Sequence, residues 1–109
     1  MKDRLEVINE RYEQISKDLL DINIVSDIKR MTALSKEQRS LEKIVEKYRA
    51  LLACESNIVE LKELVHENDP EIREMAEMEL ADAEVLLENL TQELKILLIP
   101  KDPNDEKNV

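Results

Sequence analysis

The chain has 109 residues, of which 42% are hydrophobic and 39% charged, and it contains no Gly, Phe or Trp. This length fits one small domain, and a glycine-free chain cannot contain a P-loop, a dinucleotide-binding fingerprint or a nucleophile elbow. The formal net charge of −10 opposes binding to nucleic acids or anionic membranes by overall electrostatics, although it leaves room for a local basic face.

The first segment predicts a helix over about 2–21. Its apolar residues recur at alternating steps of three and four, which places them on one helix face. These residues are Leu5, Ile8, Tyr12, Ile15, Leu19 and Ile22. Residues 21–25 predict a turn, because their β-branched side chains disfavour a helix.

A long second helix is predicted over about 27–67. Ser26 or Asp27 could cap it, whereas the capping-box pattern at Ser35 allows a later start. Its apolar seam comprises Leu34, Leu41, Ile44, Tyr48, Leu51, Ile58, Leu61 and Val65. The phase slips near Cys54 and Glu55, which predicts local unwinding or a change of packing partner. A helix of about 40 residues would be about 60 Å long, so we expect an elongated domain.

A third helix is predicted over about 70–98, after Asp69 as cap and Pro70 in the first turn. Its seam has the most regular heptad spacing in the chain: Ala76, Leu80, Ala83, Leu87, Leu90, Leu94 and Leu97. Pro100 ends the helix, and the polar segment 100–109 reads as a linker. The predicted fold is all-α: an elongated antiparallel three-helix, coiled-coil domain over 1–99 with a long second helix.

The sequence offers little for catalysis. Glu63 and His66 have the Glu-x-x-His spacing of di-iron bundles, but a full site needs a second histidine, and the chain has none. Cys54 lies near the seam and is interpreted as a core residue, since His66 is about 18 Å away along a straight helix. We therefore expect no catalytic, cofactor-binding or metal-binding residue. Tyr12 and Tyr48 occupy seam positions and are interpreted as core residues.

Charges gather on the second and third helices. The basic residues lie in the first half of the second helix: Lys29, Arg30, Lys36, Arg39, Lys43, Lys47 and Arg49. The acidic residues crowd the third: Glu71, Glu74, Glu77, Glu79, Asp82, Glu84, Glu88 and Glu93. The favoured interpretation is that the two sets pair with each other. The alternatives are that the basic set meets RNA or a ribosomal protein and that the acidic set meets a basic partner.

No stretch approaches the roughly 20 apolar residues of a membrane span, and the charged N-terminus has no signal-peptide core. With one cysteine, Cys54, the chain can form no internal disulfide, which is consistent with a reducing compartment. We expect a soluble cytoplasmic protein without membrane contact.

Four sequence blocks, in conserved order along the chain, resemble bacterial class I peptide chain release factors of the type that reads UAA and UAG. They are Leu5–Glu13, Ser35–Tyr48, Asp69–Ala76 and Leu97–Asn108. Members of that family carry a Gly-Gly-Gln loop for peptidyl-tRNA hydrolysis and a Pro-x-Thr tripeptide for stop-codon reading. A chain without glycine cannot hold the first motif, and both are expected in domains beyond Val109. The resemblance therefore implies an N-terminal domain fragment that is not an enzyme by itself.

In this family the N-terminal helical domain projects toward the GTPase-associated region of the ribosome, near the stalk-base protein, and is linked to the recycling GTPase. The resemblance implies those partners but identifies no partner-binding residue. The alternative hypothesis is a stand-alone acidic coiled-coil structural or adaptor protein. In either case an uncovered apolar stripe of a few hundred Å² would favour dimerisation of the isolated domain.

Overall fold

The computed structural model describes residues 1–100, and this part of the chain contains helices and no strand. The helices are α1 (Lys2–Asp18), α2 (Ile22–Val25), α3 (Ile28–Leu64) and α4 (Pro70–Leu97). The molecule measures 61 × 40 × 20 Å along its principal axes. The predicted all-α fold, its elongated shape and its long helix are confirmed, but there are four helices instead of three, so the long helix is the third.

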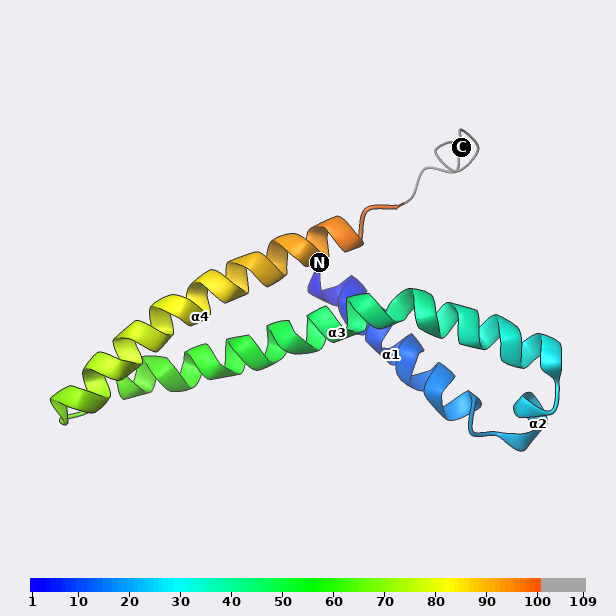
Figure 1. Cartoon of the computed structure of the whole chain (residues 1–109), viewed down its shortest axis with the longest axis horizontal. Coiled ribbons are helices and arrows are strands. Elements are labelled where there is room, and N and C mark those ends of the chain that lie inside the picture. The colour runs from blue at the N-terminus through cyan, green and yellow to red at the C-terminus, as the bar shows by residue number, and fades with distance from the viewer. Residues whose placement is uncertain (101–109) are drawn as a thin grey trace.

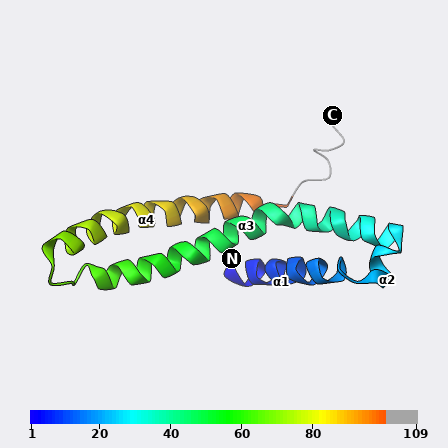
Figure 2. The ribbon, with the colours of Figure 1, turned by 60° about the horizontal axis from the view of Figure 1, so that its bottom comes forward.

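Helix α3 is the spine of the molecule (Figure 1). Its 37 residues form a rod about 56 Å long. Helix α1 runs antiparallel along the N-terminal half of α3, and α4 runs antiparallel along the C-terminal half (Figures 1 and 2). Each half of α3 therefore has its own partner helix, and the chain start and the end of α4 both lie near the middle of the spine.

Aspartate side chains begin three of the four helices. Asp21 accepts a hydrogen bond from Asn23 N, Asp27 from Arg30 N and Asp69 from Glu71 N. Each bond satisfies one of the free N–H groups of a helix start. All four C-cap residues keep right-handed helical angles, and no residue in 1–100 has a positive φ. The turns are thus closed without the left-handed cap that glycine usually supplies.

The helix boundaries differ from the predictions in several places. Helix α1 ends at Asp18 instead of residue 21, and the expected turn over 21–25 contains the short helix α2. The prediction of no helix there was wrong because the Asp21 cap and burial of Ile24 outweigh the propensity of β-branched residues. Ile22 is 74% exposed, so the seam of α1 does not extend to it.

Helix α3 is continuous from Ile28 to Leu64, so the later start at Ser35 is wrong and the end falls slightly before residue 67. Helix α4 ends at Leu97, one residue before the prediction. Of the predicted linker over 100–109, only Pro100 belongs to the described residues.

The α4 seam was predicted correctly, because every one of its positions is buried or half-buried. On α3 the buried residues are Val45, Tyr48, Leu51, Cys54, Ile58 and Leu61, and the first four follow one another at three-residue steps. Three-residue steps rotate the buried line around the helix. The phase slip near Cys54 therefore marks a change of packing partner from α1 to α4, and the alternative of local unwinding is wrong.

Candidate interaction surfaces

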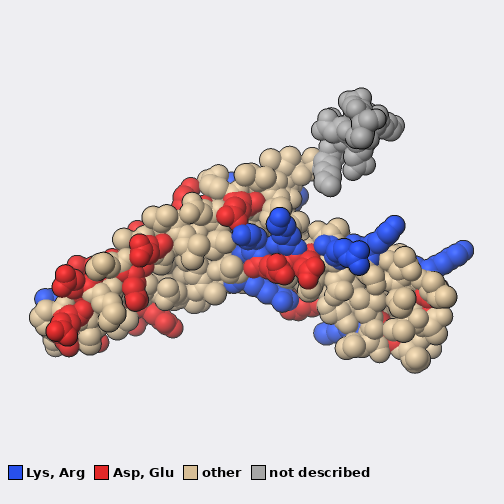
Figure 3. All heavy atoms as spheres, viewed as in Figure 1, with Lys and Arg blue, Asp and Glu red and all other residues tan. Residues whose placement is uncertain are grey.

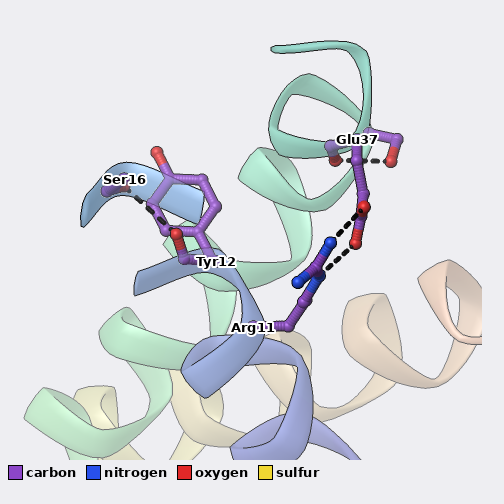
Figure 4. Close-up of polar contacts among 5 residues, drawn as sticks. Arg11, Tyr12, Ser16 and Glu37 are labelled. Atoms are coloured by element: carbon purple, nitrogen blue, oxygen red, sulfur yellow. Dashed lines mark hydrogen bonds and ion pairs between the residues drawn. The ribbon is translucent and has the colours of Figure 1, made fainter. Parts of the chain in front are cut away.

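Hydrogen bonds between side chains join α1 to the N-terminal half of α3. Arg11 donates to both carboxylate oxygens of Glu37, at 2.6 and 2.8 Å (Figure 4). Gln38 Nε2 donates to Ser16 Oγ at 2.8 Å. The guanidinium of Arg11 lowers the pKa of Glu37 chiefly by this hydrogen bonding. A bidentate pair fixes direction as well as distance, so these contacts set the register of α1 on α3.

Tyr48 adds a further polar contact between α1 and the middle of α3. Its hydroxyl donates to Glu6 Oε2 at 2.6 Å, while its ring is buried. The hydrogen bond to Glu6, with burial as the second cause, raises the pKa of Tyr48 to about 12. The guanidinium of Arg49 lies 5.6 Å from the ring centre of Tyr12, which is half-buried. The interpretation of Tyr48 as a core residue is confirmed, and Tyr12 packs at the edge of the core.

The residues considered for chemistry are not brought together. Cys54 is buried, and its thiol lies 3.2 Å from the carbonyl oxygen of Ala83 on α4, so the core interpretation is confirmed. Glu63 and His66 are both exposed, the first in the last turn of α3 and the second in the turn between α3 and α4. Within residues 1–100 no group of three or more His, Cys, Asp or Glu side chains could hold a metal ion.

The predicted pairing between the basic half of α3 and the acids of α4 is wrong for most of the set. Lys47 pairs with Glu93 at 2.6 Å, and this is the one ion pair that joins α3 and α4 in the described part of the chain. Arg49 instead approaches Glu13 of α1 at 3.6 Å. The reason is geometric: α4 packs on the C-terminal half of α3 and ends before it reaches the first basic residues.

Three lysines of this basic set lie on one line along α3, and we call Lys29, Lys36 and Lys43 the lysine stripe. They stand 25, 18 and 11 residues before Cys54, which corresponds to about seven, five and three helical turns. Since Cys54 faces α4, the stripe continues the α4-facing line of α3 into the half that α4 leaves bare (Figure 1). All three are exposed, and none makes an ion pair with a residue in 1–100.

This stripe is the feature that sequence reasoning missed. The seven-residue spacing of the three lysines was visible in the sequence. The stripe was missed because the basic set was expected to pair with the acids of α4, which would require α4 to lie along all of these residues. A helix of 28 residues that folds back from Pro70 can cover only about the last 28 residues of α3, so the length of α4 alone would have shown that Lys29 and Lys36 stay uncovered.

The opposite end of the molecule is strongly acidic. Between residues 56 and 100 there are 12 Asp or Glu residues and three Lys or Arg, a net charge of −9, whereas residues 1–55 contain 11 of each. In Figure 3, the charged side chains on the α3–α4 hairpin are mostly Asp and Glu, while Lys and Arg gather over the middle, beside some acids, and over the α1–α3 half. The acidic face of α4 is thus solvated and separate from the lysine stripe.

Apolar side chains are also exposed on the outer face of α4, away from α3. Met78, Val85 and Ile96 are 68%, 61% and 66% exposed. A shallow depression lies where the chain start meets the end of α4, and it is lined by Met1, Arg4, Lys95, Leu98, Ile99 and Pro100. No helix in the described part of the chain is both long and apolar enough to cross a membrane.

Comparison with known proteins identifies the family. The PCRF domain matches residues 8–109. The whole chain is 49% identical to Peptide chain release factor 1 of Campylobacter lari and 43% identical to that of Geobacillus kaustophilus, over 109 and 110 aligned residues. The factor of Brevibacillus brevis is 47% identical over 107 residues, which cover 97% of the chain.

The chain spans only 30 to 31% of the length of these relatives. No solved structure matches it. The resemblance seen in the sequence is confirmed by these relatives, and it favours a release-factor domain over a stand-alone adaptor. By its match over residues 8–109 and its identity to these factors, the chain belongs to the PCRF domain family of bacterial peptide chain release factors.

Proposed function

We propose that the chain is the helical N-terminal domain of a translation termination factor, and that it positions the factor on the ribosome. In this proposal the domain contacts the GTPase-associated region near the stalk base and takes part in the link to the recycling GTPase. Stop-codon reading and peptidyl-tRNA hydrolysis belong to other parts of the factor. The observation that carries the proposal is the family match over residues 8–109, with identities of 43 to 49% to named release factors.

Two properties of the chain support a contact role over a catalytic role. The sequence has no glycine, so it contains no Gly-Gly-Gln loop. The molecule is elongated, 61 × 40 × 20 Å, with one acidic end, a shape that suits a spacer reaching a distant surface better than an enclosed active site.

A release assay with competition tests this function. Ribosomes programmed with UAA and carrying labelled peptidyl-tRNA receive the chain alone, or a full-length Peptide chain release factor 1 with increasing amounts of the chain. We expect no release by the chain alone and slower release by the full-length factor, because the two compete for one ribosomal contact. The Leu90→Glu variant, which disrupts the α3–α4 core, should not compete. An unchanged release rate at every concentration of the folded chain would contradict the proposal.

The exposed apolar residues of α4 support a second, smaller proposal. Met78, Val85 and Ile96 lie on the face of α4 opposite its seam, and we propose that this face lets the separated domain self-associate. Sedimentation equilibrium tests it: the mass of the native chain should rise with concentration, and Val85→Glu should keep it monomeric. Equal masses for both proteins across the concentration range would refute the idea.

A further inference from the structure

We propose that the lysine stripe of Lys29, Lys36 and Lys43 is a docking surface for the phosphate backbone of RNA. The inference deepens the proposed function and rests on it for the identity of the RNA, which is then ribosomal RNA. It adds a specific face of α3 and a specific chemistry to the contact, neither of which follows from the family match.

The position of the stripe leaves its charges available. Helix α4 ends at Leu97, four residues after the Glu93 that pairs with Lys47, so Lys29 and Lys36 lie beyond its end and Lys43 lies exposed beside it. Arg39 adds a fourth exposed cation beside the stripe. The carboxylates on this part of the helix, Glu37, Glu42 and Glu46, are rotated about a quarter to a third of a turn away from the line, and Glu37 is paired with Arg11. The cations therefore face solvent together without a carboxylate on their own line.

The spacing of the lysines and the small size of three neighbouring side chains also fit contact with the phosphate backbone of a nucleic acid. Neighbouring lysines of the stripe are seven residues apart, or about 10.5 Å along the helix axis, and their long side chains can shift to meet successive phosphates. Three residues next to the line are small and uncharged: Thr32, Ala33 and Ser40. A strand of nucleic acid can thus approach the helix backbone closely.

The composition of the surface favours RNA over an acidic protein. Protein interfaces have an apolar centre with aromatic anchors and are depleted in lysine. Ile28 is the one large apolar side chain strongly exposed on the N-terminal half of α3, and no aromatic residue accompanies the stripe. Lysine contacts to phosphate need no such anchor, because their free energy comes from counterion release. Without aromatic side chains for stacking, the surface would read phosphate positions and not base sequence.

The net charge of −10 does not prevent this contact, because most of it comes from the hairpin half, whereas the charges of residues 1–55 cancel. Along α3, Glu60 lies 24 residues from Lys36, about 36 Å, and the acid of α4 that approaches the stripe, Glu93, is paired with Lys47. The Debye length at physiological ionic strength is about 8 Å, so the field of the hairpin is screened at the stripe. The acidic hairpin is repelled by RNA, and this repulsion points it away from the RNA surface that the stripe approaches.

A matched pair of triple variants tests the inference. One carries Lys29→Gln, Lys36→Gln and Lys43→Gln, and the other carries Lys62→Gln, Arg73→Gln and Lys95→Gln, the three cations of the hairpin half. Both lose three positive charges, so they differ only in where the charge is removed. Glutamine is a good helix former at exposed sites, and circular dichroism should show helical content and melting close to those of the native chain.

Binding is measured by fluorescence anisotropy at several salt concentrations, with large ribosomal subunits and with protein-free ribosomal RNA as probes. We expect the stripe variant to bind both probes about tenfold or more weakly, with the slope of log K against log salt reduced by about two to three. The hairpin variant should bind at least as tightly as the native chain.

The possible results separate the two proposals. If the stripe variant binds subunits as the native chain does, the RNA-docking inference is overturned while the proposed function stands. If the stripe variant loses binding to subunits but the native chain shows no affinity for protein-free RNA, the partner is an acidic protein and RNA is the wrong assignment. If the native chain binds neither probe, both the inference and the proposed ribosomal contact are wrong.

Discussion

The two halves of the spine hold their partner helices by different means. Where α1 packs on α3, a few buried side chains are accompanied by directional polar contacts. These contacts include Arg11–Glu37, Gln38–Ser16 and Tyr48–Glu6. Where α4 packs on α3, the contact is almost entirely apolar, and polar bonds are limited to Lys47–Glu93 and the Cys54 thiol. The first half is thus set in register by hydrogen bonds and the second by the shapes of its heptad residues.

The two halves, which differ in how their helices pack, also differ in net charge. The α1–α3 half uses some of its charges in contacts between helices and presents others to solvent, among them the lysine stripe, and its total charge is zero. In the hairpin half, Glu93 is the one acid that forms an ion pair among residues 1–100, so most of its acids remain free on the surface. The following substitutions test the distinction, beginning with the largest expected effect.

Leu90→Glu should be the most damaging change. Leu90 is buried in the α3–α4 core, and a carboxylate there would lie in an apolar layer without a partner. We expect the free energy of unfolding to fall by about 3–5 kcal/mol, measured by urea denaturation. Val85→Glu places the same carboxylate on the exposed face of α4 and should change the free energy of unfolding little. Equal stabilities for the two variants would disprove the assignment of the α4 seam.

Ala83→Leu should overpack the closest part of the hairpin. Ala83 is buried, and its carbonyl oxygen lies 3.2 Å from the Cys54 thiol, so a larger side chain has no room. We expect a loss of about 1–3 kcal/mol and faster reaction of Cys54 with a thiol reagent, since the helices must separate. Ala81→Leu on the exposed face is the matched control. An Ala83→Leu protein as stable and as unreactive as the control would show that the helices do not approach closely here.

Tyr48→Phe should have a smaller effect, because it removes one hydrogen bond and leaves the ring in place. We expect a loss of about 1 kcal/mol, since the exposed Glu6 carboxylate regains water. The bond also makes stability depend on alkaline pH. The pKa of Tyr48 is about 12 when folded and about 10 in an unfolded chain, so its contribution is complete below pH 10 and is lost as the pH rises through 12.

An absorbance titration checks this pH dependence. In a Tyr12→Phe background Tyr48 is the only tyrosine, and its phenolate should form near pH 12. Glu6→Gln in the same background should move the midpoint downward. A midpoint near 10 in both proteins would contradict the hydrogen bond.

Glu37→Gln should have the smallest effect, because Arg11 and Glu37 are both substantially exposed to water. The pKa of Glu37 is lowered in the folded state, so the pair stabilises the fold at neutral pH and this contribution disappears as the pH falls through the folded-state pKa. The shift in melting temperature should be below that of Tyr48→Phe and should shrink at high salt. A larger shift than that of Tyr48→Phe would mean that surface ion pairs, and not buried hydrogen bonds, hold α1 in place.

Much of the fold could be predicted from apolar spacing, and the exceptions have physical causes. The α4 seam is visible because α4 has one partner, so a single heptad pattern describes it from Ala76 to Leu97. The α3 seam is harder to read because its buried line rotates between two partners, which is why Val45 and Cys54 fall outside a simple heptad. Helix α2 was missed because it is short, and its formation depends on the Asp21 cap and on burial of Ile24.

The surfaces could be predicted less well than the fold. The sequence identifies the basic and acidic sets, but their partners depend on how far α4 reaches along α3. That reach places Lys47 beside Glu93 and leaves Lys36 bare. The polar bonds of α1, such as Arg11 to Glu37, depend on the register of two helices and have no signal in either helix alone.

Directed cleavage of ribosomal RNA tests the division of the molecule into an RNA-facing half and an outward acidic half. Cys54 is buried, so a single cysteine introduced at Thr32 beside the stripe, or at Glu77 on the hairpin, is the accessible thiol for a tethered radical-generating probe. The account predicts strong, localised cleavage of the GTPase-associated RNA from Thr32→Cys on large subunits, and weak cleavage from Glu77→Cys. Cleavage from Glu77→Cys alone, or from neither position, would contradict it.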